Sequence, residues 1–116
     1  MVKVLIAEDY LELLDFYKIS LGYELLLAKD GDEALEMYIK HKPDIVLMDL
    51  KLPKKDGIEV TKEILKIDPD ARIVAITAYG YLGPKALEVG AKDVIRKPFK
   101  ISELNDLISK YAKKQN

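Results

Sequence analysis

The sequence predicts an α/β fold in which one open parallel sheet is covered on both faces by helices. Three observations lead to this prediction. Short apolar segments typical of strands alternate with longer segments of helical periodicity along the chain. Five such pairs fit within 116 residues, which is enough for one domain with its own core. No linker, internal repeat or low-complexity stretch separates them.

The expected strands are short apolar runs that end at turns or at polar residues. The third contains four consecutive apolar residues, Ile45 to Met48, and ends on a carboxylate, Asp49. Such a run is typical of a strand that is buried on both faces. Strands are expected at residues 2–7, 23–28, 44–49, 72–77 and 91–97.

The expected helices repeat apolar residues three or four positions apart. Ala34, Leu35 and Tyr38, for example, share one helical face. Pro43 follows the second helix, and Gly90 is expected to cap the fourth. Helices are expected at residues 10–21, 33–40, 57–67, 82–89 and 101–112, and the polar tail at 113–116 is expected to fray.

Composition excludes several classes of protein. The net charge of −1 differs from the clearly basic balance of most nucleic-acid binders, so we expect no nucleic-acid partner. No apolar run is long enough to cross a bilayer, and the first residues read as a strand and not as a signal peptide. We therefore expect a cytoplasmic protein without a membrane partner. The absence of cysteine excludes disulfides and thiolate metal sites.

Polar side chains occur where four of the five strands end. Glu8 and Asp9 follow the first strand, and Asp49, Thr77 and Lys97 end the third, fourth and fifth. Each has an ordinary explanation by itself, as a helix N-terminal acid, a cap or a solvated charge. Together they lie on one edge of a parallel sheet, where the sites of such folds form. The pattern predicts a functional site there.

The charges at this edge predict a metal ion. Two unit charges roughly 4 Å apart interact by about 4 kcal/mol at an effective dielectric near 20, so three clustered carboxylates repel strongly. Lys97 alone does not offset three acids. Oxygen ligands without His or Cys favour Mg²⁺. A carboxylate beside Mg²⁺, an ammonium and a hydroxyl is a natural phosphoryl acceptor, and aspartyl phosphate is a known type of covalent intermediate.

Five segments carry a resemblance to a known family. They are IAEDY (6–10), DIVLMDLKLPKKDG (44–57), AITAYG (75–80), GAKDV (90–94) and RKPF (96–99). Together they resemble the receiver domain of bacterial response regulators of two-component systems, the CheY-like family, over essentially the whole chain. The segments TAYG and KLPKKDGIEV are most similar to single-domain regulators of sporulation-type phosphorelays. The resemblance implies a flavodoxin-like (βα)5 fold with strand order 2-1-3-4-5.

The resemblance also implies roles for individual residues. Asp49 would accept a phosphoryl group from a histidine kinase or another phosphohistidine donor, and the protein would signal or relay it onward. Asp9 and Asp49 would bind Mg²⁺, helped by Glu8 through water and by the backbone carbonyl of Lys51. Lys97 would pair with the phosphoryl group.

Two further features follow from the same resemblance. Thr77 would close over the phosphoryl group as a switch hydroxyl, and the Lys97–Pro98 peptide bond is expected to be cis, which is uncommon elsewhere. Lys51 and Tyr79 lie two residues after Asp49 and Thr77. Both are long, and we expect them to shield the phosphoryl group from hydrolysis.

The chain departs from the family pattern in three ways. Val94 stands three residues before Lys97, where the family usually has an aromatic residue, so the usual hydroxyl–aromatic switch lacks its aromatic partner. The segments 9–22 and 77–90 are shorter than usual, so their helices are expected to be trimmed or to begin differently. No output domain is expected, and residues 1–116 are assigned to the receiver domain.

The first helix is apolar on nearly every side. Tyr10, Leu13, Leu14, Tyr17 and Leu21 share one side of a helical wheel, and most of them are expected to be buried. Both a core helix and a partner site fit this pattern. The resemblance implies that the kinase or a histidine phosphotransfer protein docks there. We expect the protein to be a monomer. The expected docking residues are Leu11, Leu13, Phe16 and Pro98; His41, at a helix end, is given no catalytic role.

Three rival interpretations fit the sequence less well. A phosphatase of the haloacid dehalogenase type needs a second Asp where Lys51 stands. A nucleotide-binding domain needs a glycine-rich loop where the chain has Glu8-Asp9-Tyr10. A pseudo-receiver would only bind partners, but every acid, hydroxyl and ammonium is present. The sequence therefore favours a phosphoacceptor signalling protein, which is not an enzyme beyond assisting its own phosphotransfer and autodephosphorylation.

Overall fold

The computed structural model describes residues 2–112, in which five strands alternate with five α-helices. The expected fraying of residues 113–116 lies outside the described residues. The strands are β1 (Lys3–Ala7), β2 (Glu24–Ala28), β3 (Ile45–Asp49), β4 (Ile73–Thr77) and β5 (Asp93–Arg96). The helices are α1 (Leu11–Ser20), α2 (Gly31–His41), α3 (Gly57–Ile67), the short 3₁₀ helix η1 (Gly80–Leu82), α4 (Gly83–Glu88) and α5 (Ile101–Tyr111).

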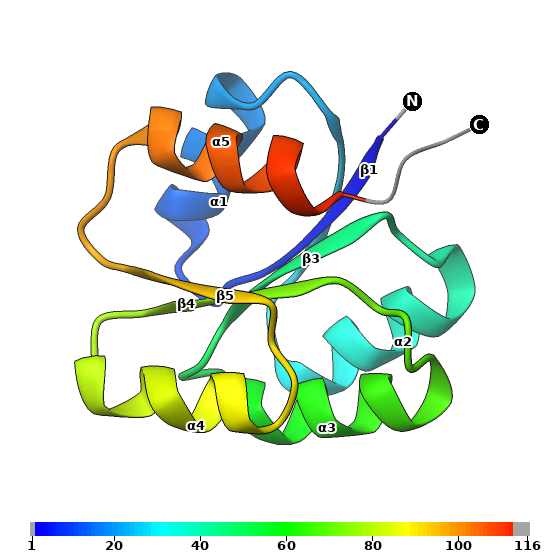
Figure 1. Ribbon diagram of the computed structural model, residues 1–116. Helices are drawn as coiled ribbons and strands as arrows, with labels where there is room; N and C mark the ends of the chain where they lie inside the picture. Colours follow the sequence, from blue (N-terminus) through cyan, green and yellow to red (C-terminus); the bar gives the residue numbers. More distant parts are fainter. Residues whose placement is uncertain (1, 113–116) are drawn as a thin grey trace.

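All five strands are parallel, in the order β2-β1-β3-β4-β5. Helices α1 and α5 cover one face of the sheet, and α2, α3 and α4 cover the other (Figure 1). The predicted fold and strand order are thus confirmed. The chain leaves β1 for β2 and then returns to the other side of β1 to form β3. This reversal is a topological switch point, where ligand sites of such sheets form outside the carboxyl ends of the strands.

The central strands are buried on both faces, and this explains their uninterrupted apolar sequence. In β1, Val4 and Ile6 pack in the core under α1 and α5, whereas Leu5 and Ala7 pack in the core under α2 and α3. All five residues of β3 and of β4 are buried. Charged residues within the strands are tolerated at the two sheet edges, where Glu24 of β2 and Arg96 of β5 are exposed.

Helix α1 buries most of the side that the sequence predicts. Leu14, Tyr17 and Leu21 are buried, and Leu13 is half-buried. Tyr10 is the exception, because it is 58% exposed. Tyr10 is the N-cap residue and has an extended backbone, so its side chain does not follow the helical face.

Several helix and strand ends differ from the predicted ends. Helix α2 begins at Gly31, two residues early, because the carboxylate of Asp30 caps it by accepting the N–H of Glu33 at 2.8 Å. The fourth helix begins as the 3₁₀ helix η1, in line with the expected change in that segment. Strand β5 starts at Asp93 because the N–H of Ala91 still bonds to the carbonyl of Ala86, at the end of α4.

Two backbone predictions are confirmed. Gly90 follows α4 with φ 116°, a conformation that residues with a Cβ rarely adopt. The Lys97–Pro98 bond is cis. Among the described residues, no helix is long and apolar enough to cross a membrane.

Candidate functional site

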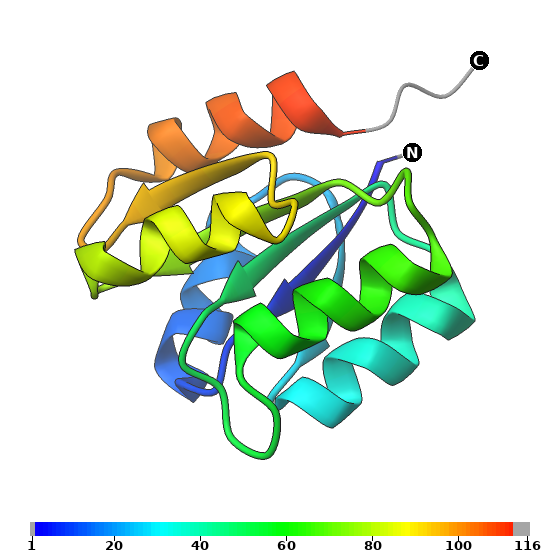
Figure 2. The same ribbon diagram turned by 60° about the horizontal axis from the view of Figure 1, so that its bottom comes forward.

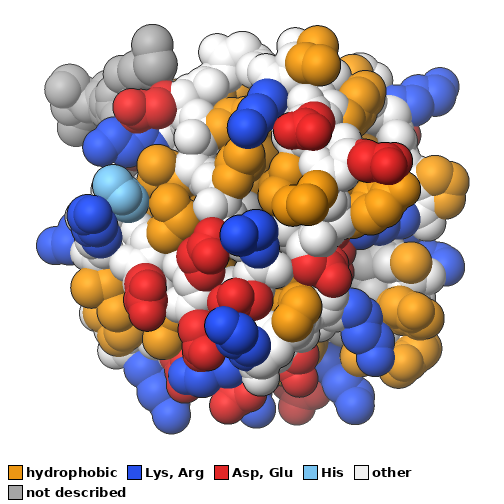
Figure 3. All heavy atoms as spheres, turned by 180° about the vertical axis from the view of Figure 1, so that it is seen from behind, with side chains coloured by type: hydrophobic (Ala, Val, Ile, Leu, Met, Phe, Trp, Pro, Cys, Tyr) orange, Lys and Arg blue, Asp and Glu red, His pale blue; other side chains and the backbone are white. Residues whose placement is uncertain are grey.

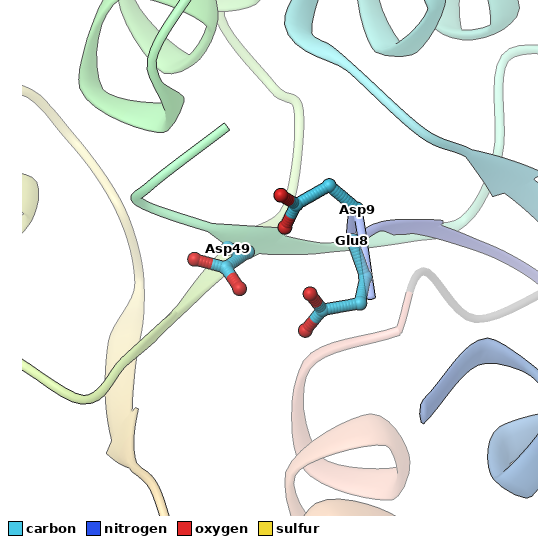
Figure 4. Close-up of side chains that lie close together, drawn as sticks. All are labelled: Glu8, Asp9 and Asp49. Atoms are coloured by element: carbon cyan, nitrogen blue, oxygen red, sulfur yellow. The ribbon is translucent and has the colours of Figure 1, made fainter. Parts of the chain in front are cut away.

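Three carboxylates meet at the carboxyl ends of β1 and β3. Glu8 and Asp9 come directly after β1, and Asp49 is the last residue of β3. One oxygen from each lies within 4.8 Å of the others, and Figure 4 shows the three groups converging. Glu8 and Asp49 are buried, whereas Asp9 is exposed. The carboxyl ends of β1 and β3 lie side by side (Figure 2). The sheet therefore brings together the three acids that the sequence predicts at this edge.

Lys97 is the cation that balances the two buried acids. Its ammonium donates to Oε1 of Glu8 and to Oδ2 of Asp49, at 2.8 Å in each case. The residue lies directly after β5, and its N–H bonds to the carbonyl of Thr77, which continues the pairing with β4. One ammonium is thus shared by two carboxylates that lie 89 and 48 residues away in the sequence.

Burial and hydrogen bonds act in opposite directions on the pKa values of Glu8 and Lys97 in this cluster. Burial raises the pKa of Glu8 above its ordinary 4.5, the hydrogen bond from Lys97 opposes the rise, and the charge of Asp49 adds to it. Burial by itself would lower the pKa of Lys97. Its hydrogen bonds to Asp49 and Glu8 outweigh burial, so the pKa of Lys97 lies above 10.5. Lys97 therefore holds its proton more tightly than an ordinary lysine, and Glu8 loses its proton less readily than an ordinary glutamate.

The loop after β3 fixes the Asp49 carboxylate. The N–H of Lys51 donates to Oδ1 of Asp49 at 2.9 Å. Gly57 begins α3 directly against this point, and a Cβ there would lie 2.3 Å from the carbonyl oxygen of Asp49. Only glycine allows α3 to approach so closely. The sequence motif contains Gly57, but its packing role emerges only from the structure.

Thr77 is buried at the end of β4, next to the acids in the sheet order. Its hydroxyl accepts the N–H of Tyr79 at 2.9 Å and donates to the carbonyl of Tyr79 at 3.2 Å. This local turn orients the hydroxyl toward the following loop. The predicted switch hydroxyl is therefore in the predicted place, with its hydrogen bonds made to Tyr79.

Two long side chains meet beside the cluster. The ammonium of Lys51 lies 5.2 Å from the centre of the Tyr79 ring, within the range of a cation–π contact. Tyr79 also makes an edge contact with Tyr81, with ring centres 6.1 Å apart. Val94, at the position where an aromatic residue is usual in the family that the sequence resembles, is half-buried against a small apolar cluster.

The donor set fits a hard divalent cation. The clustered ligand atoms are all carboxylate oxygens, which Mg²⁺ prefers, and Lys97 forms ion pairs with two of the three acids, Glu8 and Asp49. The Lys51 carbonyl, predicted as a further ligand, belongs to the residue whose N–H holds Asp49. Its role as a ligand stays a prediction.

Three of the expected docking residues, Leu11, Leu13 and Phe16, belong to α1, which begins two residues after Asp9, and the fourth, Pro98, follows Lys97. Leu11 and Phe16 are 60% and 47% exposed, Pro98 is exposed and Leu13 is half-buried. In Figure 3, hydrophobic side chains show on the upper part of the face, on the side of the sheet that α1 and α5 cover. His41 is the last residue of α2, the helix end that the sequence predicts for it.

Comparison with known proteins agrees with this geometry. Residues 4–109 match the response regulator receiver domain family. Sporulation initiation phosphotransferase F of Bacillus subtilis is 41% identical over 92 residues, which are 78% of this chain and 74% of the relative. The chemotaxis protein CheY of Thermotoga maritima is 44% identical over 95 residues, which are 79% of each chain. The expected likeness to sporulation-type regulators is confirmed, and this chemotaxis protein is similarly close.

A solved structure extends the likeness to three dimensions. In the complex of CheX with CheY, BeF₃ and Mg²⁺ from Borrelia burgdorferi, the matching chain superposes with a TM-score of 0.88 and 31% identity. The match covers 97% of this chain and 90% of that one. The same fold is thus found in a protein crystallised with Mg²⁺ and BeF₃.

Proposed function

This chain belongs to the response regulator receiver domain family, and on that premise we propose that Asp49 is its phosphoryl acceptor. The donor is a phosphohistidine on a sensor histidine kinase or a histidine phosphotransfer protein. The observation that carries the proposal is the environment of Asp49, a buried carboxylate at a sheet edge that shares the ammonium of Lys97 with Glu8. Its oxygens are fixed by hydrogen bonds, and an exposed acid, Asp9, lies beside it.

The proposed transfer is a single displacement at phosphorus. An oxygen of Asp49 forms the new P–O bond while the P–N bond of the phosphohistidine breaks. The electron pair leaves with the imidazole nitrogen, which then takes a proton from solvent. Lys97 is poised to stabilise the phosphoryl oxygens, because its ammonium already lies 2.8 Å from the Asp49 carboxylate.

The carboxylates of Asp9 and Asp49 and the carbonyl of Lys51 would hold Mg²⁺, helped by Glu8 through water. When bound, the ion supplies positive charge that offsets the clustered acids and the phosphoryl oxygens. Thr77 contributes the hydroxyl that closes over the phosphoryl group, in exchange for its present bonds to Tyr79.

We assign the donor's docking surface to α1 and the start of the loop after β5. Leu11 and Phe16 expose large apolar area next to the Asp49 edge, and Leu13 and Pro98 border it. The receiver acts as a monomer. The phosphoryl group is then relayed onward or read by a binding partner.

The test is phosphorylation by a small phosphodonor with Mg²⁺, followed by intact mass. The parent should gain one acid-stable, base-labile phosphoryl group, and Asp49→Ala should gain none. Asp106→Ala, which removes an exposed acid of α5, is the matched control and should behave like the parent. A phosphorylated Asp49→Ala would place the acceptor elsewhere, and a parent that gains nothing would favour a binding-only module.

A second arm addresses the metal. Mg²⁺ should raise the melting temperature of the parent, because it binds the folded form. Asp9→Ala should lose most of this increase. Equal stabilisation of the parent and of Asp9→Ala by Mg²⁺ would contradict the assignment.

A further inference from the structure

The side chain of Tyr17, on α1, is fully buried, yet its hydroxyl has no hydrogen-bond partner within residues 2–112. Within residues 2–112, it is the only buried side-chain nitrogen or oxygen that lacks a hydrogen-bond partner. A buried hydroxyl gives up its hydrogen bonds to water, so an unpaired one is unfavourable and calls for an explanation. Phenylalanine would fill nearly the same space without this disadvantage.

Tyr17 lies next to the acid cluster. Its ring stacks on Phe99, two residues after Lys97, with ring centres 6.4 Å apart and planes 7° apart. Burial raises the pKa of Tyr17, and the negative charges of Glu8 and Asp49 raise it further. Val4, Ile6 and Tyr17 pack in the same core cluster, and the N–H of Glu8 bonds to the carbonyl of Ala28, which continues the pairing of β1. Side chains two residues apart in a strand share a face, so the Glu8 side chain lies on the side of the sheet that Tyr17 covers.

Glu8 depends on a donor that the proposed function would take away. Oε1 of Glu8 accepts from Lys97, and Oε2 accepts from the N–H of Tyr10 at 3.1 Å. Lys97 is shared with Asp49, and a phosphoryl group there adds negative charge that draws the ammonium away from Glu8. Glu8 is only 2% exposed, so apart from a water that would link it to Mg²⁺, solvent has little access to replace the lost donor.

We propose that Tyr17 is a positioning residue whose hydroxyl donates a hydrogen bond to the Glu8 carboxylate when Lys97 turns toward a phosphoryl group on Asp49. The inference rests on the proposed function of Asp49. It explains why a hydroxyl is kept at this buried position, since the group is unpaired in the resting form and paired in the phosphorylated one. Tyr17 acts through Glu8 and does not touch the phosphoryl group.

Tyr17→Phe separates this role from an ordinary core role. Phenylalanine keeps the ring and its stacking on Phe99 and removes only the hydroxyl. If Tyr17 were merely core, the loss of an unpaired hydroxyl would leave stability and ligand binding unchanged or improved. If the proposal holds, the resting form is unharmed and only the phosphorylated form is weakened.

The experiment measures unfolding in urea and the affinity for fluoroberyllate, a phosphoryl mimic, in the presence of Mg²⁺. Without the mimic, Tyr17→Phe should be at least as stable as the parent. With it, Tyr17→Phe should bind fluoroberyllate about tenfold more weakly, the effect of losing one hydrogen bond to a charged acceptor. Such a loss of affinity without a loss of stability is not expected from a packing defect.

Tyr38→Phe is the matched control. Its hydroxyl donates to Asp68 at 2.7 Å, so this variant should lose stability equally with and without the mimic and keep the parental affinity. Parental affinity in Tyr17→Phe would overturn the inference and leave Asp49 phosphorylation intact. A parent that binds no fluoroberyllate and takes up no phosphoryl group would overturn the proposed function, and this inference with it.

Discussion

The two ends of the candidate site are built differently. The acid–lysine cluster (Glu8, Asp49 and Lys97) joins three strands through buried ion pairs between residues far apart in the sequence. The tyrosine loop (residues 77–81) is held by bonds between residues two apart, and its Tyr79 and Tyr81 are 47% and 66% exposed. The first end is part of the fold's core, whereas the second can rearrange without disturbing the sheet.

This difference suggests a division of labour. Groups that must hold charge in a fixed geometry belong on strand ends, where the sheet positions them. Groups that cover the site or change position belong on a loop with local contacts, which opens at little cost in free energy. We therefore expect substitutions in the acid–lysine cluster to affect stability, and those in the tyrosine loop to affect rates.

The largest expected effect is on stability, from Lys97→Met. Glu8 and Asp49 would be left buried without their shared ammonium, while methionine keeps most of the apolar stem. The ammonium is partly accessible, with the Lys97 side chain 26% exposed, so we expect a loss of about 2–3 kcal/mol in the free energy of unfolding. Urea unfolding in EDTA measures it.

Lys55→Met provides the comparison for that value. Lys55 pairs with Glu63 at 3.0 Å on the surface of α3, with both side chains about one third exposed. Lys55→Met should lower the free energy of unfolding by less than about 1 kcal/mol. Equal losses in the two variants would mean that the acid–lysine cluster is no more dependent on its cation than a surface pair.

The next effect concerns the lifetime of the phosphoryl group. Lys51 and Tyr79 contact each other beside Asp49 and should exclude or misplace the water that hydrolyses the aspartyl phosphate. Lys51→Asn and Tyr79→Ala are expected to speed decay about tenfold, equivalent to about 1.4 kcal/mol of barrier. Single-turnover decay at fixed Mg²⁺ is the measurement.

Tyr81→Ala distinguishes shielding from general loosening of the tyrosine loop. It removes the ring that packs on Tyr79 but leaves Tyr79 and Lys51 in place. Decay of this variant should stay near the parental rate. Parental decay in both Lys51→Asn and Tyr79→Ala would show that the two side chains do not protect the phosphoryl group.

The smallest effect is a pH dependence of stability due to Glu8. Because its pKa is raised in the folded protein, the native state holds this proton more tightly than the unfolded state does. The resulting contribution to stability is full below pH 4.5 and is lost as the pH rises through the raised pKa. Glu8→Gln removes this dependence.

The measurement compares the parent and Glu8→Gln in EDTA between pH 4 and 7. The stability of the parent relative to Glu8→Gln should fall as the pH rises across the lower part of this range. A constant difference would mean that Glu8 has the same pKa in the folded and unfolded states. Burial would then disfavour the charged form of Glu8 less than the structure indicates.

The place of the candidate site could be read from the sequence because of a general property of parallel sheets. Their strands all end at one edge, so polar residues at the strand ends must converge whatever the details of packing. Apolar runs that stop at Asp49 and Thr77 were therefore enough to place them near Glu8 and Asp9. The roles of these residues came from the family resemblance and not from the spacing.

Other features were decided only by tertiary packing. The exposure of Tyr10 depends on an N-cap backbone, and the early start of α2 on a hydrogen bond to Asp30. The sharing of Lys97 between Glu8 and Asp49 depends on the distance between three strand ends. Tyr17 looked like one more apolar residue of a helix, because periodicity shows which face is buried. Whether a buried hydroxyl finds a partner depends on atoms from distant segments, and only the folded chain places those.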